Sequence, residues 1–389
     1  MKAAPAPGIG TALALALAAA VSLGLARFSY ALLLPPMRAD LGWSYFTAGA
    51  MNTVNAAGYL AGALLLPPLL ARHDARRVLL AGSVGAAALL AAHGAATGEL
   101  PLFLLRFTTG VASAATFVAG GLLAARLAQS APHPGLVLGL YYGGTGLGIV
   151  ASALAVPPLA ARSGLHAWQG AWWALGALAA LCTAALAAAT RGLASPKPPA
   201  AAAREAVRWR RFGFMLAGYL MFGLGYIGYM TFVVTLLREQ GLAEPLIVAF
   251  YVVLGLGVVA SSWLWAGLLQ RYRGGQPLAL LNGLLAVATL LPVLLAHPVA
   301  VFASGALFGG VFLSVVASTT AFVRHNLPAS AWPAGISAFT IVFAAGQIVG
   351  PSVVGWIADG PGGLARGFVC SAAVLALGAA IALRQRPLG

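Results

Sequence analysis

The chain has 389 residues, of which 61% are hydrophobic and 7% are charged, and its mean hydropathy is +0.93. Soluble domains carry about 25% charged residues, so this composition excludes an ordinary cytosolic globule, a disordered chain and a fibrous repeat. Cys182 and Cys370 are the two cysteines, which are too few for a disulfide framework. We therefore expect an all-α integral membrane protein.

Twelve apolar segments are long enough to cross a bilayer, which takes about 20 residues. The first six run over 10–36, 45–71, 77–97, 100–129, 134–160 and 167–189. The second six run over 209–238, 244–271, 277–296, 299–325, 331–358 and 364–384. The first segment is longer than the core of a signal peptide, so we expect an uncleaved span. A Pro- and Ala-rich linker at 190–208 divides the chain into two six-helix bundles, 1–189 and 209–389.

The net charge of +15 has an uneven distribution along these spans. Twelve spans put both termini on one side, and the loops of that side hold 16 of the 22 Lys and Arg residues. The opposite loops hold Arg38, Arg162, Arg238 and Arg366, while Arg27 and Arg106 lie within spans. This asymmetry predicts cytoplasmic termini in a bacterial-type inner membrane. It also accounts for the positive charge without a nucleic-acid partner.

Short matching blocks recur about 200 residues apart in corresponding spans. The block 106–110 in span 4 matches 306–310 in span 10, and 69–72 at the end of span 2 matches 268–271 at the end of span 8. The block 79–82 matches 280–283, and the position of Tyr30 in span 1 is close to that of Tyr229 in span 7. These blocks predict two pseudo-symmetric halves, the plan of a secondary transporter with a substrate site near the bilayer midplane.

Several motifs resemble the major facilitator superfamily (MFS) over nearly the whole chain, and its YbfB/YjiJ-like branch in particular. They are Arg27-Phe-Ser-Tyr30, Leu34-Pro-Pro-Met37 and Asp40-Leu-Gly42 in span 1, Gly58-Tyr-Leu-Ala-Gly62 in span 2, and Gln347-Ile-Val-Gly-Pro351 with Gly355-Trp-Ile-Ala-Asp359 in span 11. The resemblance implies the MFS fold and transport by alternating access, with a small-molecule substrate and no cofactor.

The superfamily's loop between spans 2 and 3 has a Gly, then an Asp, then a basic cluster. This chain keeps the basic cluster and has Pro68 and Arg72 at the other two positions. The resemblance implies a degenerate gating motif made of Asp74, Arg76 and Arg77. Span 5 lacks the Gly-Pro pair of drug/proton antiporters, which argues against that class.

Polar residues on one face of a span predict a cavity lining, whereas the nearly uniform spans 3, 6, 9 and 12 are predicted to face lipid. By this criterion the candidate substrate-binding residues are Arg27, Tyr30, Asn52, Asn55, Tyr59, Arg106, Thr109, Tyr141, Tyr142, Tyr226, Tyr229, Tyr251 and Gln347. Three structural alternatives remain open: membrane Ser and Thr often bond to backbone carbonyls, glycines often allow close helix packing, and Tyr can lie at the membrane interface.

Arg27 and Arg106 are the most informative candidates, because an Arg in the hydrocarbon needs an anion, carbonyls or water. The seven acidic residues are predicted in loops or at span ends. We therefore hypothesise that the substrate supplies the negative charge, as a small organic anion such as a monocarboxylate, paired with guanidinium. The alternatives are that Arg106 bonds to helix carbonyls in a structural and gating role, and that Arg27 reaches Asp359 or the outer interface.

An enzyme, a channel, a receptor and an efflux transporter are the alternative functions. The six histidines are scattered and no catalytic or metal signature appears, so neither an enzyme nor a metal site is expected. A channel lacks a filter loop, and a receptor that has lost transport stays open. Efflux of amphipathic or cationic compounds is the main alternative, because Phe28, Tyr226, Tyr229, Phe232 and Tyr251 could line such a pocket. A proton could travel with the substrate, and we expect a monomer.

Overall fold

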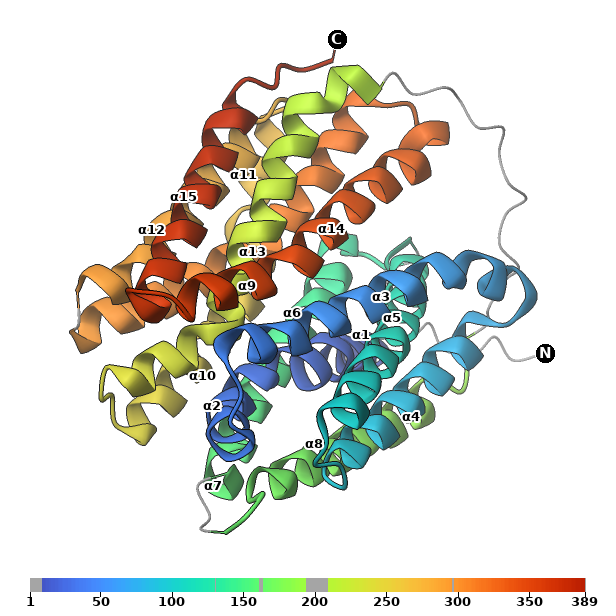
Figure 1. Cartoon of the computed structure of the whole chain (residues 1–389). Helices are drawn as coiled ribbons and strands as arrows, with labels where there is room; N and C mark the ends of the chain where they lie inside the picture. Colours follow the sequence, from blue (N-terminus) through green and yellow to red (C-terminus); the bar gives the residue numbers. More distant parts are fainter. Residues whose placement is uncertain (1–8, 130, 161–163, 194–208, 296, 389) are drawn as a thin grey trace. The chain divides into compact units, whose positions relative to one another are not determined.

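The computed structural model describes residues 9–129, 131–160, 164–193, 209–295 and 297–388 (Figure 1). All regular structure in these residues is helical, and twelve helices are long and apolar enough to cross a membrane. Helices suit this environment because they satisfy their backbone hydrogen bonds internally. The described part therefore confirms the predicted fold class.

The helices of the first half follow the predicted spans closely. They are α1 (Ile9–Ala19), the π-helix η1 (Ala20–Phe28), α2 (Tyr30–Leu41), α3 (Tyr45–Arg72), α4 (Ala75–His93), α5 (Glu99–Gln129), α6 (Pro134–Ala155), α7 (Pro157–Ala160) and α8 (Trp168–Ala189). The third span ends earlier than predicted, at His93, where Gly94 caps the helix.

The second half has the same number of spans. Its helices are η2 (Trp209–Phe212), α9 (Gly213–Glu239), α10 (Glu244–Leu264), α11 (Ala266–Arg271), α12 (Gln276–Leu294), α13 (Pro298–Asn326), η3 (Ala329–Ala331), α14 (Trp332–Ala358) and α15 (Gly363–Leu383). The predicted span 8 is divided into α10 and α11 at Trp265, and proline occupies the first turn of α10, α12 and α13.

The chain forms two compact units. Unit 1 falls within Met1–Leu41 and Val54–Pro198, and unit 2 within Gly42–Thr53 and Pro199–Gly389. Helix α3 contributes its first turns to unit 2 and the rest to unit 1. Residues 194–208 of the predicted linker lie outside the described residues, as do Lys2, Lys197, Arg204, Arg208 and Arg162 of the charge distribution. The bundle boundaries at 189 and 209 therefore stay a prediction.

Glycines bring the helices of each unit into backbone contact. In unit 1, a Cβ added to Gly58 of α3 would lie 2.0 Å from the Phe107 carbonyl oxygen, and one added to Gly110 of α5 would lie 2.2 Å from the Asn55 carbonyl oxygen. In the same unit, a Cβ added to Gly144 of α6 would lie 2.0 Å from the Ala16 carbonyl oxygen of α1, and one added to Gly148 would lie 2.5 Å from the Ala20 carbonyl oxygen of η1. These contacts confirm that glycines in spans 4 and 5 serve close packing, as one structural alternative expected.

Span 1 contains a feature that the sequence pattern did not predict. Its middle third, η1, is a π-helix, and the Ser29 amide donates to the Gly24 carbonyl five residues earlier, at 3.0 Å. Longer π-helical stretches are rare, and short ones occur often at functional sites. Arg27 lies inside this stretch.

Candidate substrate site

The two membrane arginines both lie in unit 1 and both are buried. Arg106 of α5 has no exposed surface, and Arg27 of η1 is 4% exposed. Arg106 donates to the carbonyl of Ala26, the residue before Arg27, so both arginines belong to one region of the unit. A single Arg in the hydrocarbon costs about 2.5–3.5 kcal/mol, so both residues need favourable contacts inside the unit.

Arg106 is held by backbone and by aromatic rings. Its Nη1 donates to the Ala26 carbonyl oxygen of η1 at 2.9 Å. Its guanidinium carbon lies 4.9 Å from the ring centroid of Tyr30 and 6.0 Å from that of Trp172. Arg106 therefore has the helix carbonyl that the structural alternative expected, together with cation–π contacts.

Arg27 lies against two aromatic rings and borders the same region. Its guanidinium carbon is 6.0 Å from the ring centroid of Tyr59 and 5.9 Å from that of Phe28. Asn55 donates through Nδ2 to the Arg106 carbonyl oxygen at 3.0 Å and so fixes α3 beside α5.

The structure thus brings six predicted site residues together in unit 1: Arg27, Tyr30, Asn55, Tyr59, Arg106 and Thr109. Thr109 lies one turn after Arg106 and is fully buried. Within the described chain, its hydroxyl has no hydrogen-bond partner. Tyr59 is half-buried, whereas the other five are buried.

The tyrosine pair of α6 forms a separate group. Tyr141 is fully buried and donates its hydroxyl to the Phe117 carbonyl oxygen. Tyr142 is 42% exposed, and the two rings are 5.2 Å apart. Packing explains Tyr141, while the exposed Tyr142 is able to contact a ligand or lipid.

The remaining candidates belong to unit 2, where aromatic packing dominates. Tyr229 shares a hydrogen bond of 2.7 Å with Ser304 and stacks on Phe308 at 4.0 Å. Tyr226 stacks on three further rings, and Tyr251 is fully buried. These contacts give Tyr226 and Tyr229 a structural function, and a part in substrate binding stays a prediction for all three tyrosines.

Two amide side chains complete the predicted set in unit 2. Asn52, in the part of α3 that belongs to this unit, donates through Nδ2 to Thr231 Oγ1 at 2.8 Å. Gln347 of α14 is 4% exposed. Both are buried polar groups, and a ligand contact for either one stays a prediction.

The predicted gating residues form the start of α4. Asp74 is its N-cap, and the carboxylate accepts the backbone N–H groups of Arg76 at 2.8 Å and Arg77 at 3.2 Å. The Arg76 side chain donates to Thr190 and to the Ala187 carbonyl oxygen at the end of α8. The negative Asp74 at the start of α4 and the positive Arg76 side chain at the end of α8 each have the charge that the helix dipole favours. A gating role for the three residues stays a prediction.

The acidic residues in the described part of the chain all lie at helix ends, as expected from the sequence. Asp40, Glu99, Glu239 and Glu244 are within the first or last turn of α2, α5, α9 and α10, Asp74 caps α4, and Asp359 follows α14. Glu205 lies outside the described residues. Within unit 1, Asp40 lies 13 residues after Arg27 along the same span, and Glu99 lies seven residues before Arg106 on α5.

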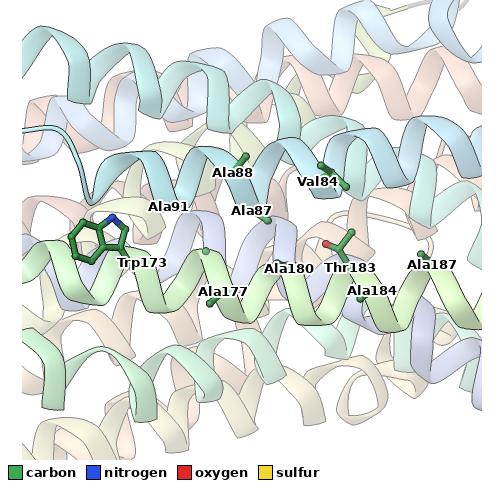
Figure 2. Close-up of a pocket in the computed structure, with 11 residues that line it drawn as sticks. Val84, Ala87, Ala88, Ala91, Trp173, Ala177, Ala180, Thr183, Ala184 and Ala187 are labelled. Atoms are coloured by element: carbon green, nitrogen blue, oxygen red, sulfur yellow. The ribbon is translucent and has the colours of Figure 1, made fainter.

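A groove of about 660 Å³ runs between α4 and α8, and Figure 2 shows its lining. Most of its lining residues are alanines, and its hydroxyl group, on Thr183, donates to the Ala179 carbonyl oxygen. This chemistry suits an acyl chain, and the indole N–H of Trp173 is the other polar side-chain group of the lining. The groove is formed by spans 3 and 6, which the sequence predicted to face lipid.

Comparisons with known proteins define the class first. The fold matches a bacterial homologue of the human lysosomal transporter Spinster, solved in an inward-facing and occupied conformation, with a TM-score of 0.74 at 13% identity. That match covers 98% of this chain and 97% of the other. The nucleoside transporter NupG matches with a TM-score of 0.70 at 15% identity, over 97% of this chain and 100% of that one. The chain therefore has the MFS fold.

A family model then gives the branch. The model described as "Uncharacterised MFS-type transporter YbfB" matches residues 19–383, so the chain belongs to this family of membrane transporters, which are not enzymes. A curated relative, the "Chloramphenicol resistance protein" of Streptomyces lividans, is 29% identical over 370 residues, which cover 91% of this chain and 92% of the relative. The predicted superfamily and branch are both confirmed.

Proposed function

We propose that this protein is a secondary transporter of a small organic anion, such as a monocarboxylate, and that Arg27 and Arg106 attract the anion. The observation that carries the proposal is the burial of two guanidinium groups in one region of unit 1, where Arg106 donates to the carbonyl of Ala26, the residue before Arg27. Guanidinium pairs well with carboxylate, and the pairing strengthens where water is excluded.

The neighbouring residues suit an anion with an apolar or aromatic body. Tyr30 and Tyr59 offer ring faces, and Thr109 offers a buried hydroxyl. Asn55 donates to the backbone carbonyl of Arg106, and the Ala26 carbonyl accepts from the Arg106 guanidinium. These bonds fix the position of the positive charge before a ligand binds. The substrate would bind and leave by alternating access, as in other transporters built from repeats.

A thermal-shift screen with matched ligands tests this proposal. Benzoate and benzamide have nearly the same shape and differ in charge, so an anion site should be stabilised by benzoate alone. Ligands that bind the folded state raise its apparent stability by mass action. Arg27→Gln and Arg106→Gln should each abolish the shift, while Arg366→Gln, which removes an exposed arginine, should keep it. Equal shifts with benzoate and benzamide would contradict the proposal.

Efflux of an amphipathic, uncharged or cationic compound is the second candidate. It is supported by the name of the Streptomyces lividans relative and by the stacked rings of Phe222, Tyr226 and Phe343 in unit 2. Chloramphenicol and tetraphenylphosphonium belong in the same screen. Stabilisation by these compounds, unchanged in the arginine variants, would favour this candidate over anion transport.

We further propose an inner-membrane location with both termini in the cytoplasm, because Lys and Arg concentrate in the loops on that side. Single cysteines replacing Arg191 and Arg366, in a chain whose Cys182 and Cys370 are changed to alanine, test this orientation in intact cells. An impermeant maleimide should label the Arg366→Cys variant, and the Arg191→Cys variant only after lysis. The opposite pattern would reverse the topology.

A further inference from the structure

His93, the last residue of α4, is a buried titratable group in unit 1 with a specific hydrogen-bond arrangement. Its side chain has no exposed surface, and Nδ1 lies 2.7 Å from the Leu89 carbonyl oxygen. Because a carbonyl only accepts, Nδ1 carries the hydrogen and Nε2 keeps the lone pair in the neutral ring. No described residue offers Nε2 a hydrogen-bond partner. The ring is therefore fixed with its proton-accepting atom unused.

One indole ring connects His93 to the buried arginines. The imidazole stacks on Trp172 of α8, with ring centroids 4.3 Å apart and planes inclined by 22°. The guanidinium of Arg106 lies 6.0 Å from the centroid of the same residue. An indole face stabilises a cation. Trp172 is fully buried, and its Nε1 also has no partner among the described residues.

Two cations lie near His93 in unit 1. Arg106 on α5 lies against the same Trp172 as the imidazole, and it donates to the carbonyl of Ala26, the residue before Arg27 on η1. The ring of α8 that faces His93 is the uncharged Trp172, and Tyr30 of α2 lies against Arg106. A proton on Nε2 would therefore add a second positive charge beside Arg106, which is unfavourable. An anion bound at Arg106 would neutralise the charge of this arginine and so make protonation of His93 more favourable.

We propose that His93 is a proton-binding site coupled to the anion site: Nε2 takes up one proton when an anion binds beside Arg106 and releases it when the anion leaves. Nδ1 keeps its hydrogen throughout, so the imidazolium carries one proton for one negative charge. This inference rests on the proposed anion transport and assigns the coupling ion to it. The transported unit would be one anion with one proton.

Calorimetry of benzoate binding to the purified full-length protein tests this coupling. Titrations at one pH in two buffers with different ionisation enthalpies report the number of protons taken up. We expect one proton per benzoate for the wild type. The dissociation constant should also rise about tenfold per pH unit between pH 6 and 8, where the carboxyl of benzoate stays ionised.

Two substitutions separate the proton from the fold. His93→Asn keeps a donor for the Leu89 carbonyl and removes Nε2, so it should bind benzoate with no proton uptake and a dissociation constant constant within about twofold over this pH range. His133→Gln is the control, because His133 is exposed and makes no side-chain capping bond. It should behave as the wild type does.

The outcomes are distinct. Benzoate binding without proton uptake in the wild type overturns the role of His93 and leaves anion binding intact. Proton uptake that persists in a folded His93→Asn variant also overturns it. The absence of benzoate binding at any pH in the wild type overturns the anion proposal and, with it, this inference. The wild-type titration is sufficient if His93→Asn fails to fold.

Discussion

Units 1 and 2 have equivalent helix contacts and different interiors. Gly58 approaches the Phe107 carbonyl in unit 1, and Gly257 approaches the Ala306 carbonyl in unit 2; Gly110 approaches Asn55, and Gly309 approaches Leu254. Each of these four residues of unit 2 lies 199 positions after its counterpart in unit 1. The repeat expected from the sequence is therefore present in the packing, as the parallel-repeat plan requires. The expected pairing of block 106–110 with 306–310 was wrong by one residue, because Gly110 matches Gly309.

The same offset shows where the units differ. Arg106 corresponds to Gly305, where an added Cβ would lie 2.7 Å from the ring of Phe250. Arg27 corresponds to Tyr226, which stacks among other rings. One buried charge of unit 1 thus corresponds to a glycine packed against an aromatic ring in unit 2, and the other corresponds to an aromatic ring.

The backbone follows the same division. Residues 20–28 are π-helical in unit 1, whereas the corresponding residues 219–227 belong to the regular α-helix α9. In the π-helical stretch, the Ala26 carbonyl accepts from Arg106. Unit 1 therefore has buried cations among its helices, while the equivalent helices of unit 2 have a packed aromatic interior.

The largest expected effect on stability comes from substituting the glycines at the equivalent helix contacts of the two units. Gly110→Ala and Gly309→Ala place a Cβ 2.2 and 2.1 Å from a backbone oxygen, and overpacking of this kind costs about 1–3 kcal/mol or more. Both variants should lose folded protein to a similar extent in size-exclusion chromatography after detergent extraction. Gly283→Ala, which meets no atom within 4 Å, should match the wild type. A large effect in one unit alone would break the equivalence.

A long-range helix cap is the next largest contribution. The Asp359 carboxylate accepts the N–H groups of Tyr45 and Phe46 at 2.7 and 2.9 Å, at the start of α3 within unit 2. Losing a cap costs about 0.5–2 kcal/mol. Asp359→Ala should therefore lower the melting temperature about as much as Asp74→Ala, which removes the cap of α4 in unit 1. An unchanged melting temperature for Asp359→Ala would show that this bond contributes nothing.

Tyr229→Phe tests whether the tyrosine of unit 2 is structural. The variant loses the hydrogen bond to Ser304, and such bonds contribute about 0.6 kcal/mol in membrane proteins. We expect a small drop in melting temperature and an unchanged dissociation constant for benzoate. A dissociation constant raised several-fold would place Tyr229 in the substrate site.

The apolar groove of unit 1 should be the least sensitive region. Ala177→Val adds two methyl groups at an exposed position of the lining, and its effect on stability should stay within about 0.5 kcal/mol. Benzoate affinity should not change. A loss of affinity would contradict the assignment of this groove to lipid.

Much of the fold could be predicted because each span needs a long apolar run, which a sequence displays directly. Arg27 and Arg106 were also accessible, because charges within such runs are rare. The π-helix could not be predicted, since residues 20–28 have an ordinary apolar composition. The burial of His93 depends on the stacking of Trp172 from another helix, and a list of six histidines contains no sign of it.

Locating a bound anion tests the central claim most directly. Crystals of the protein soaked with 4-iodobenzoate give an anomalous iodine peak that marks the ligand independently of any variant. We predict a carboxylate within hydrogen-bond distance of the guanidinium of Arg27 or Arg106 in unit 1. An iodine peak among the stacked rings of Phe222, Tyr226 and Phe343 in unit 2, with no ligand at either arginine, would contradict the account.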